Sequence, residues 1–343
     1  MISKDDIRDL LSTAASFDTD ALRSFLTSDA QKPLIAVGSG GMSGVAEYVS
    51  LLYGTMCGLG KAVTPLEMNS LSDETLSKAK VLLLSKSGKN NDINFAARRC
   101  LELAPSDTAC MCLNNGDKNK LHLLFTRQNA RDRDFLFDAD VKDGFVSEGS
   151  PIMYLALFAK AFGVLDQVYA GLEATNFSFE TQRGDHPDWD ALKPVRHLTV
   201  LSSGWASPVA RLLEGKCVES GWASAQLSDY RNYCHGRFIF TSNHLDDSAV
   251  VMLISPREAH LSGQIRSFLP PSTKLFLIRT DLDSPATSLD LLIQTTLLFS
   301  ILCQNIGVNP DRPSNPGKID KRAPMNVTFI HQLKEAGPMH TDL

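Results

Sequence analysis

The stretch LIAVGSGGMSG, residues 34–44, joins a short apolar run to a glycine-rich turn and the start of a helical pattern. The stretch VLLLSKSGKNND, residues 81–92, repeats this order with a serine-rich turn. Short apolar runs suit strands that are buried on both faces of a parallel sheet. Because helical patterns at 42–53 and 92–103 follow these runs, the sequence predicts an α/β domain with a parallel sheet flanked by helices.

The same order returns in the second half of the chain. Apolar runs at 198–201, 250–254 and 275–278 alternate with helical patterns at 208–220 and 257–268. The spacing of the runs is similar in both halves, although the residues themselves are not repeated. We therefore predict two tandem copies of one three-layer α/β/α unit. At one helix start, Ser150 is the predicted N-cap, because Pro151 follows it at the first helical position.

The predicted organisation follows from these copies and from the turn-rich segments around them. A segment with Gly184, Pro187, Pro194 and several charges separates the copies, and the last segment holds four prolines in NPDRPSNPGKIDKRAP, which prevent a long helix. The predicted parts are N-terminal helices at 1–30, a first domain at 31–174, a linker at 175–194, a second domain at 195–308 and an extended C-terminal tail at 309–343.

Composition excludes several classes of protein. The net charge of the 343 residues is −5 and no basic block occurs, so we expect no nucleic-acid partner. The first residues lack the apolar run of a secretory signal. The most apolar long stretch, 289–308, contains Asp290 and Gln294, which favours a buried helix over a membrane span. We therefore expect a cytoplasmic protein with no membrane partner.

The seven cysteines are odd in number and form no CxxC pair. They are expected to be reduced, mostly buried thiols, as in cytoplasmic proteins. Cys110 and Cys112 are two residues apart in an apolar run and share one strand face. A metal site at this pair is not expected, and neither a metal nor another cofactor is predicted.

The first turn, residues 38–44, follows a strand and opens a helix, where backbone amides and the helix dipole favour an anion. It is a poor dinucleotide motif, because Ser43 stands where G-x-G-x-x-G needs its last glycine. The next strand also ends in Thr64-Pro65 and not in an acidic residue. A tight turn with no ligand is the other interpretation of this stretch.

The second turn, residues 85–92, places two serines, a lysine and an asparagine just before a helix N-terminus. It contains no Walker motif. Two such turns at the carboxyl ends of strands predict a phosphate site. The predicted phosphate-binding residues are Ser39, Gly40, Ser85, Lys86, Ser87 and Asn90.

Together these turns resemble the sugar isomerase (SIS) domain family. Residues 38–44 resemble the family's C-G-T-S-x-x-S-G turn, and residues 85–92 resemble S-Q-S-G-E-T-x-D. The two-domain pattern is similar to the isomerase half of glucosamine-6-phosphate synthase, and the resemblance spans about 34–318. It implies two tandem SIS domains, and pairing into a homodimer or a higher homo-oligomer.

Three further positions resemble the family's catalytic residues. Cys234-His235-Gly236 is similar to the family's K-H-G-P turn. Glu219 precedes His235 by 16 residues, which is the spacing between the family's catalytic glutamate and histidine. The tail matches the D-x-D-x-P-R-N-L-A-K string at Asp311, Pro313, Asn315 and Lys318. The resemblance implies that Glu219, His235 and Lys318 are catalytic, with His235 reaching the partner's pocket.

These residue types suit the isomerisation of a phosphosugar. A carboxylate such as Glu219 can move a proton between C1 and C2, and the C-terminal end of its helix is expected to raise its pKa. His235 can carry the proton that ring opening requires, and Lys318 can form an imine with the sugar carbonyl or polarise it. Singly, each could equally be an ordinary surface residue.

The chain departs from the family's motifs at four positions. Gly40 replaces a serine, Lys86 a glutamine, Lys89 a glutamate and Asn90 a threonine. These differences leave the identity of the sugar substrate undecided. We expect a phosphosugar isomerase, isomerising deaminase or deglycase. Glutaminase activity is not expected, since no amidotransferase domain precedes Leu34. The alternatives are a non-catalytic phosphosugar sensor and an interaction protein in a larger assembly.

Overall fold

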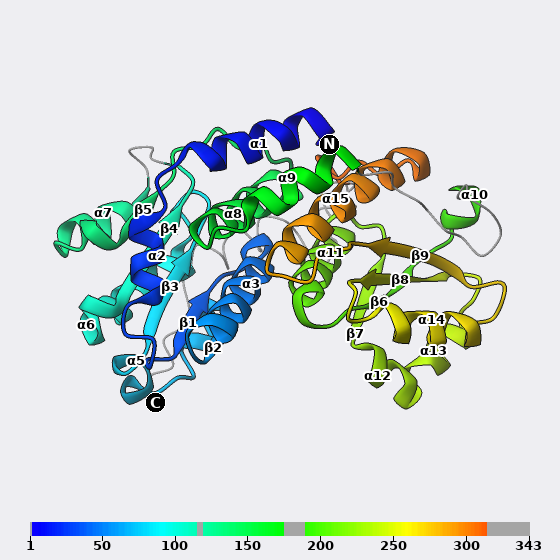
Figure 1. The fold of residues 1–343 in the computed structure, drawn as a ribbon, viewed down its shortest axis with the longest axis horizontal. Coiled ribbons are helices and arrows are strands. Elements are labelled where there is room, and N and C mark those ends of the chain that lie inside the picture. Colours follow the sequence, from blue (N-terminus) through cyan, green and yellow to red (C-terminus); the bar gives the residue numbers. More distant parts are fainter. Residues whose placement is uncertain (1, 115–118, 175–188, 314–343) are drawn as a thin grey trace, which may run out of the picture. The chain divides into compact units, whose positions relative to one another are not determined.

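Figure 1 shows the chain in a computed structural model, which describes residues 2–114, 119–174 and 189–313. Helices alternate with strands, and the strands form two parallel sheets. This arrangement confirms the predicted α/β class. Most of the predicted linker and of the predicted tail, including Asn315 and Lys318, lies outside the described residues.

The contacts within the chain divide it into two compact units. The first-sheet unit is Phe17–Val141, and the second-sheet unit combines Met1–Ser16 with Lys142–Pro313. The sequence-based division puts 142–174 with the first sheet, whereas the contacts group this segment with the second.

The first sheet has the strand order β2-β1-β3-β4-β5 and all its pairs are parallel. Its strands are β1 (Leu34–Val37), β2 (Gly60–Val63), β3 (Lys80–Leu84), β4 (Thr108–Cys112) and β5 (Asp134–Leu136). Every residue of β1, β3 and β4 is buried, as expected for strands covered on both faces.

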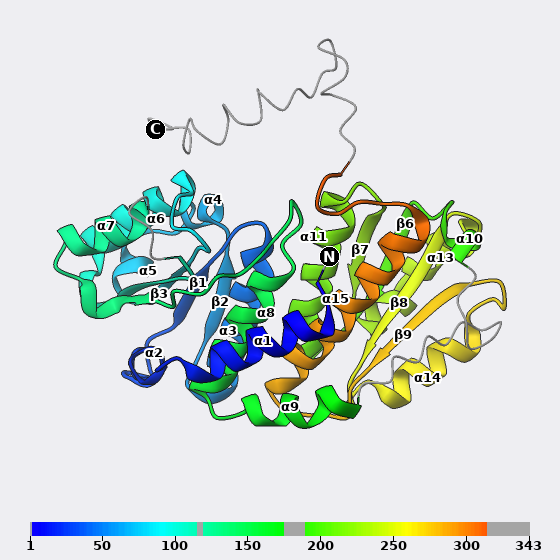
Figure 2. The same ribbon diagram turned by 90° about the horizontal axis from the view of Figure 1, so that it is seen from above.

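Helices cover both faces of this sheet (Figure 2). Val37, Leu83 and Cys110 lie in one core cluster with residues of α6 and α7, while α3 packs on β1 and β2. The helical segments are α2 (Asp20–Thr27), α3 (Gly41–Met56), α4 (Pro65–Met68), α5 (Asp73–Ser77), α6 (Asn91–Leu103), α7 (Lys120–Arg127) and the short 3₁₀ turns η1 (Pro105–Asp107) and η2 (Arg131–Arg133).

The second sheet has the order β7-β6-β8-β9 and is also parallel throughout. Its strands are β6 (His197–Leu201), β7 (Ser224–Ser228), β8 (Ser248–Ile254) and β9 (Lys274–Arg279). The central strand β8 is buried along its whole length, whereas the edge strand β7 is mostly only half-buried.

On the second sheet, one core cluster joins Leu201, Met252 and Leu277 to residues of α12 and α14. The helix α15 packs against α11, α8 and α9. The helical segments are α1 (Lys4–Ser16), α8 (Gly149–Ala161), α9 (Leu165–Ala174), α10 (Trp189–Leu192), η3 (Gly204–Ala206), α11 (Ser207–Glu219), α12 (Tyr230–Asn232), the π-type turn η4 (Tyr233–Arg237), α13 (Phe238–Asn243), α14 (Ala259–Phe268) and α15 (Ala286–Ile306).

The predicted buried helix in the most apolar stretch is confirmed as α15. It is long and apolar enough to cross a membrane, but 89% of its most apolar window is buried inside the protein. It ends where Gly307 adopts a left-handed conformation with φ of 78°. These features describe a core helix of the second-sheet unit.

The predicted N-cap at Ser150 is wrong. Helix α8 begins at Gly149, and Asp143 Oδ1 accepts hydrogen bonds from the backbone N–H groups of Glu148, Gly149 and Ser150. A carboxylate from the preceding loop therefore caps this helix, where the positive end of the helix dipole favours a negative charge.

Candidate functional site

The first sheet has a topological switch point between β1 and β3. β1 is followed by β2 on one side, and β3 is followed by β4 on the other. In α/β proteins, ligands bind beyond the carboxyl ends of the strands at such a point. Because Val37 is paired with Leu83, the turns that follow β1 and β3 start side by side. The two turns that hold the six predicted phosphate-binding residues therefore begin at the same edge of the first sheet.

The turn after β1 leaves donors free. The N–H of Gly38 donates to Val63 O at 3.1 Å, and a Cβ on Gly38 would lie 2.3 Å from Met42 O. Gly40 has φ of 55° and ψ of −131°, a conformation that essentially only glycine adopts. Within the described residues, the amides of Ser39 and Gly40 and the Ser39 hydroxyl make no hydrogen bond.

The turn after β3 is held by its own first serine. The N–H of Ser85 donates to Met111 O at 3.1 Å, and Ser85 Oγ accepts from the N–H of Gly88 at 3.1 Å. In the described part of the chain, the hydroxyl of Ser87 and the amides of Ser87 and Lys89 have no protein partner. These groups, together with those of the first turn, form a set of donors that an anion can satisfy.

Two of the predicted ligands already have structural roles. Asn90 Oδ1 accepts from the N–H groups of Asp92 at 2.8 Å and Ile93 at 3.3 Å, so Asn90 is the N-cap of α6. Its side-chain amide still carries N–H donors. Lys86 Nζ donates to Val141 O at 2.8 Å, which ties its ammonium group to the segment after β5.

The second sheet has the same kind of switch point, between β6 and β8. Gly204 follows β6 with φ of 50°, much as Gly40 follows β1. At this second switch point, however, the buried carboxylate of Glu258 lies beyond the ends of β6 and β8. Glu258 Oε1 accepts from Ser203 Oγ at 2.5 Å, and Glu258 Oε2 accepts from the N–H of Ser255 at 3.0 Å and from Ser255 Oγ at 2.5 Å.

The two switch points therefore differ in what they offer a ligand. Glu258 is only 6% exposed and satisfies the serine donors of the second sheet from within the chain. Ser39 and Ser87 of the first sheet have no such internal acceptor among the described residues. Of the two points, the one at β1 and β3 has donors free for an external anion.

Glu219 is the last residue of α11 and is half-buried. One turn earlier, Lys216 is buried and donates from Nζ to Ser147 O at 2.7 Å. Burial lowers the pKa of Lys216, while the negative charges of Glu148, Asp143 and Glu219 oppose that effect. A cationic side chain and a carboxylate thus share the C-terminal end of α11.

His235 is exposed and lies in η4, where Gly236 has φ of 108°. Helix α11 leaves the carboxyl end of β6 and returns to the amino end of β7, whereas η4 follows the carboxyl end of β7. Glu219 and His235 therefore lie toward opposite ends of the second sheet. The structure does not bring them together within this unit.

The start of the predicted catalytic tail is described, but its lysine is not. Asn309 Oδ1 accepts from the N–H groups of Asp311 at 3.0 Å and Arg312 at 3.2 Å, which forms a turn directly after α15. The N–H of Val146 donates to Pro310 O at 3.2 Å. Lys318 lies outside the described residues.

All seven cysteines are described, none of them forms a disulfide and five are buried, which confirms that most of the thiols are buried. Cys110 Sγ donates to Asp134 Oδ1 at 3.1 Å. The described residues contain no group of three or more histidine, cysteine, aspartate or glutamate side chains that could hold a metal ion.

Sequence reasoning missed Glu258 and Lys216. A signal for Glu258 was available, because Ser255 and Glu258 form the S-x-x-E pattern of a capping box. Its contact with Ser203, far away along the chain, could not be foreseen. Lys216 gave no sequence signal, because an isolated lysine on a helix is usually exposed.

Comparison with solved structures supports the fold. The C-terminal domain of glucosamine-fructose-6-phosphate aminotransferase from Francisella tularensis matches with a TM-score of 0.61 and 13% identity, over 90% of this chain and 95% of that one. Glucosamine-6-phosphate deaminase from Thermotoga maritima matches with a TM-score of 0.62 and 15% identity, over 91% and 98%. Tagatose-6-phosphate ketose/aldose isomerase from Escherichia coli matches with a TM-score of 0.62 and 18% identity, over 91% and 95%.

This likeness confirms the resemblance to sugar isomerase proteins at the level of the fold. No protein-family model matches the sequence, and a sequence search of curated proteins finds no match.

Proposed function

We propose that this protein is an enzyme of phosphosugar metabolism that moves a proton between C1 and C2 of its substrate. It would act as an aldose–ketose isomerase, an isomerising deaminase or a deglycase. The observation that carries the proposal is the pair of turns after β1 and β3. Their free hydroxyls and amides at a switch point suit the phosphate of a sugar.

In this proposal the phosphate is bound chiefly by Ser39, Ser87 and the amides of Gly40 and Lys89. Ser85 can still donate from its hydroxyl while it accepts from Gly88. Asn90 would contribute its side-chain amide while it caps α6. Lys86 would contribute its backbone and a nearby positive charge, because its ammonium group is bound to Val141 O.

The proposed chemistry assigns a role to each remaining residue. Glu219 is the base that removes the proton from carbon, and the side chain of Lys216 lies one helical turn before it in α11. His235 carries the proton for ring opening, and Lys318 polarises the carbonyl or forms an imine with it. A proton transfer of this kind needs no redox cofactor.

We also propose that the protein pairs with itself and that His235 serves the partner's site. Two observations support this. Glu219 and His235 lie toward opposite ends of the second sheet, so they do not serve one site within this unit. The neighbours of His235, Phe238 and Ile239, are 42% and 54% exposed, and exposed apolar side chains of this kind are typical of protein interfaces.

A phosphosugar sensor is the second candidate. The free donors of Ser39 and Ser87 favour this function equally, because a sensor needs only to bind its phosphosugar. A panel of hexose phosphates tested first by thermal shift and then for turnover separates the two functions. Binding with turnover supports the enzyme, binding without turnover supports the sensor, and no binding contradicts both.

A further inference from the structure

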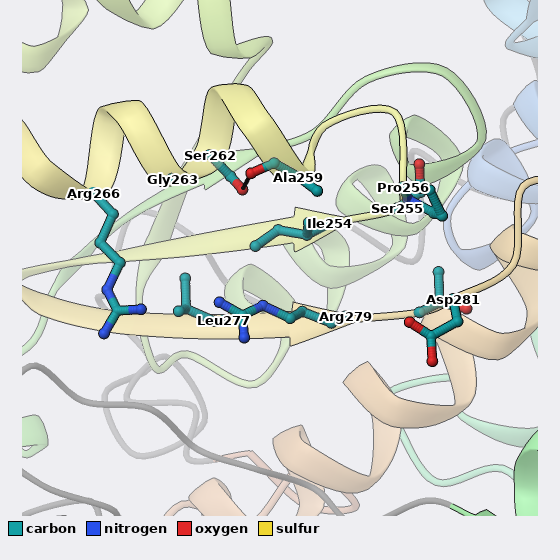
Figure 3. A pocket seen from close by; sticks show the side chains of 11 residues that line it. Ile254, Ser255, Pro256, Ala259, Ser262, Gly263, Arg266, Leu277, Arg279 and Asp281 are labelled. Carbon is teal, nitrogen blue, oxygen red and sulfur yellow. Dashed lines mark hydrogen bonds between the residues drawn. The ribbon is translucent and has the colours of Figure 1, made fainter.

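A pocket of about 420 Å³ lies between α14 and the carboxyl ends of β8 and β9, within the second-sheet unit (Figure 3). This volume falls in the range of roughly 300–1,000 Å³ that is usual for small-molecule sites. The pocket shares Ser255 with the switch point between β6 and β8 that Glu258 fills, and extends from there along α14 and β9. No role proposed above uses it.

The pocket exists because α14 presents small side chains to it. Ala259, Ser262 and Gly263 line it at helical spacing. Ser262 Oγ donates to Ala259 O at 2.9 Å and so stays close to the helix. A Cβ built on Gly263 would meet no atom within 4 Å. The space beside α14 is therefore open and is not blocked by the backbone.

Two arginines from different elements give the pocket its charge. Arg266 belongs to α14 and Arg279 is the last residue of β9. Leu275 and Leu277 belong to the core beneath α14, and Arg279 continues the same face by strand alternation. In Figure 3, Arg279 runs back along β9 toward the guanidinium of Arg266.

The arginines make the pocket suited to a doubly charged oxyanion. A guanidinium group is always protonated and offers five donors in a planar fork. Each arginine also interacts within the chain. The five N–H donors of a guanidinium group allow it to bind more than one partner at a time. The carboxylate of Asp281 and the backbone around Thr280 line the same space and can accept from ligand hydroxyls.

We propose that this pocket binds a small phosphate monoester that carries hydroxyl groups, with its phosphate on Arg266 and Arg279. This is a second ligand site, separate from the turns after β1 and β3. The limited volume and the mixture of two cations with Asp281 fit a sugar phosphate better than a long polyanion, which needs an extended basic surface.

The test compares variants of the full-length protein by titration calorimetry with glucosamine 6-phosphate and with inorganic phosphate as probes. Gly263→Leu fills the pocket but keeps every charge, and R266A/R279A removes the charges. Arg23→Ala, at an exposed position of α2, is the charge control. Each variant is first checked for an unchanged unfolding transition.

The proposal predicts that glucosamine 6-phosphate or inorganic phosphate binds at two sites in the wild type and in Arg23→Ala. One of these sites weakens at least tenfold in both Gly263→Leu and R266A/R279A. The same titrations with Ser87→Ala show which of the two binding sites is formed by the turns after β1 and β3. Loss of that site is thereby distinguished from loss of this pocket. Equal binding by the wild type, Gly263→Leu and R266A/R279A would overturn the proposal.

Discussion

Ser203 Oγ lies 2.5 Å from Glu258 Oε1 and donates a hydrogen bond to it, so a side chain of the protein itself closes the carboxyl ends of β6 and β8. Ser255 completes the arrangement from the other strand. The corresponding donors at β1 and β3 have no internal acceptor among the described residues. One fold thus carries a switch point that is filled from within and another whose donors are free for a ligand.

Removing this internal carboxylate should expose an anion site. Glu258→Ala leaves the half-buried donor of Ser203 and the buried donors of Ser255 without an acceptor, which costs about 1–3 kcal/mol of unfolding free energy. Phosphate should restore part of that loss, because it supplies oxygen acceptors in the same place. Urea unfolding with and without phosphate at constant ionic strength measures the effect. The control is Glu74→Ala, an exposed carboxylate on α5. Equal stabilisation of both variants by phosphate would contradict this account.

Ser87→Ala should weaken phosphosugar binding and leave the fold intact. Its hydroxyl has no partner to lose among the described residues, whereas a hydrogen bond to a charged group contributes about 1.5–3 kcal/mol, or roughly 10- to 100-fold in affinity. Titration calorimetry measures the change, and Ser12→Ala on the exposed side of α1 is the control. Unchanged affinity in Ser87→Ala would remove the turn after β3 from the site.

Much of the fold could be predicted from local patterns. The run at 34–37 coincides with β1 and the pattern at 92–103 nearly coincides with α6, because buried strands and capped helices leave clear periodic signals. The edge strand β7, SAQLS, was missed, since a half-buried polar strand resembles a loop. The cap of α8 was misassigned to Ser150, because Asp143 acts from a loop that no helical pattern includes.

The candidate site, like the fold, could be predicted only where its features are local in the sequence. The two turns of the proposed phosphate site were predictable, because glycine and serine after a buried strand are local features. The filling of the second sheet's switch point from within was not, since it depends on Glu258 contacting Ser203, which is far away along the chain. The separation of Glu219 from His235 also follows from topology, which their spacing along the chain does not reveal.

Buried thiols should make the protein sensitive to alkaline pH. Burial raises the pKa of Cys100 from 9.0 to about 12. Between these values the unfolded thiol loses its proton and the folded one keeps it, so unfolding free energy falls by about 1.4 kcal/mol per pH unit for each such thiol. The contribution is complete below about pH 9 and is lost as the pH rises toward 12.

Under reducing conditions, Cys100→Ala should therefore show a shallower fall in unfolding free energy above pH 9 than the wild type. Cys234→Ala, at an exposed thiol, should fall as steeply as the wild type. Urea unfolding at pH 8, 9.5 and 10.5 makes the comparison. Identical slopes for Cys100→Ala and the wild type would show that this thiol does not titrate as its burial requires.

Mixing inactive variants should reveal whether His235 serves a partner's site. In a mixed dimer of Glu219→Gln and His235→Ala, one site would keep both residues if they come from different chains. After random exchange of subunits, about a quarter of wild-type activity should then return. Size-exclusion chromatography checks that mixed dimers form. Formation of such dimers without recovered activity would place both residues in the site of one chain, or outside any site.

The proton transfer itself provides the most direct test of the central claim. Hydrogen exchange in heavy water, at C2 of glucosamine 6-phosphate or at C1 of fructose 6-phosphate or tagatose 6-phosphate, can be followed by NMR with wild type and Glu219→Gln. We predict exchange with the wild type for at least one of these sugars, and exchange slower by about 10²–10⁴-fold in Glu219→Gln, with phosphate affinity nearly unchanged. Tight binding of these phosphosugars by the wild type with no exchange at C1 or C2 would contradict the enzyme and leave the sensor.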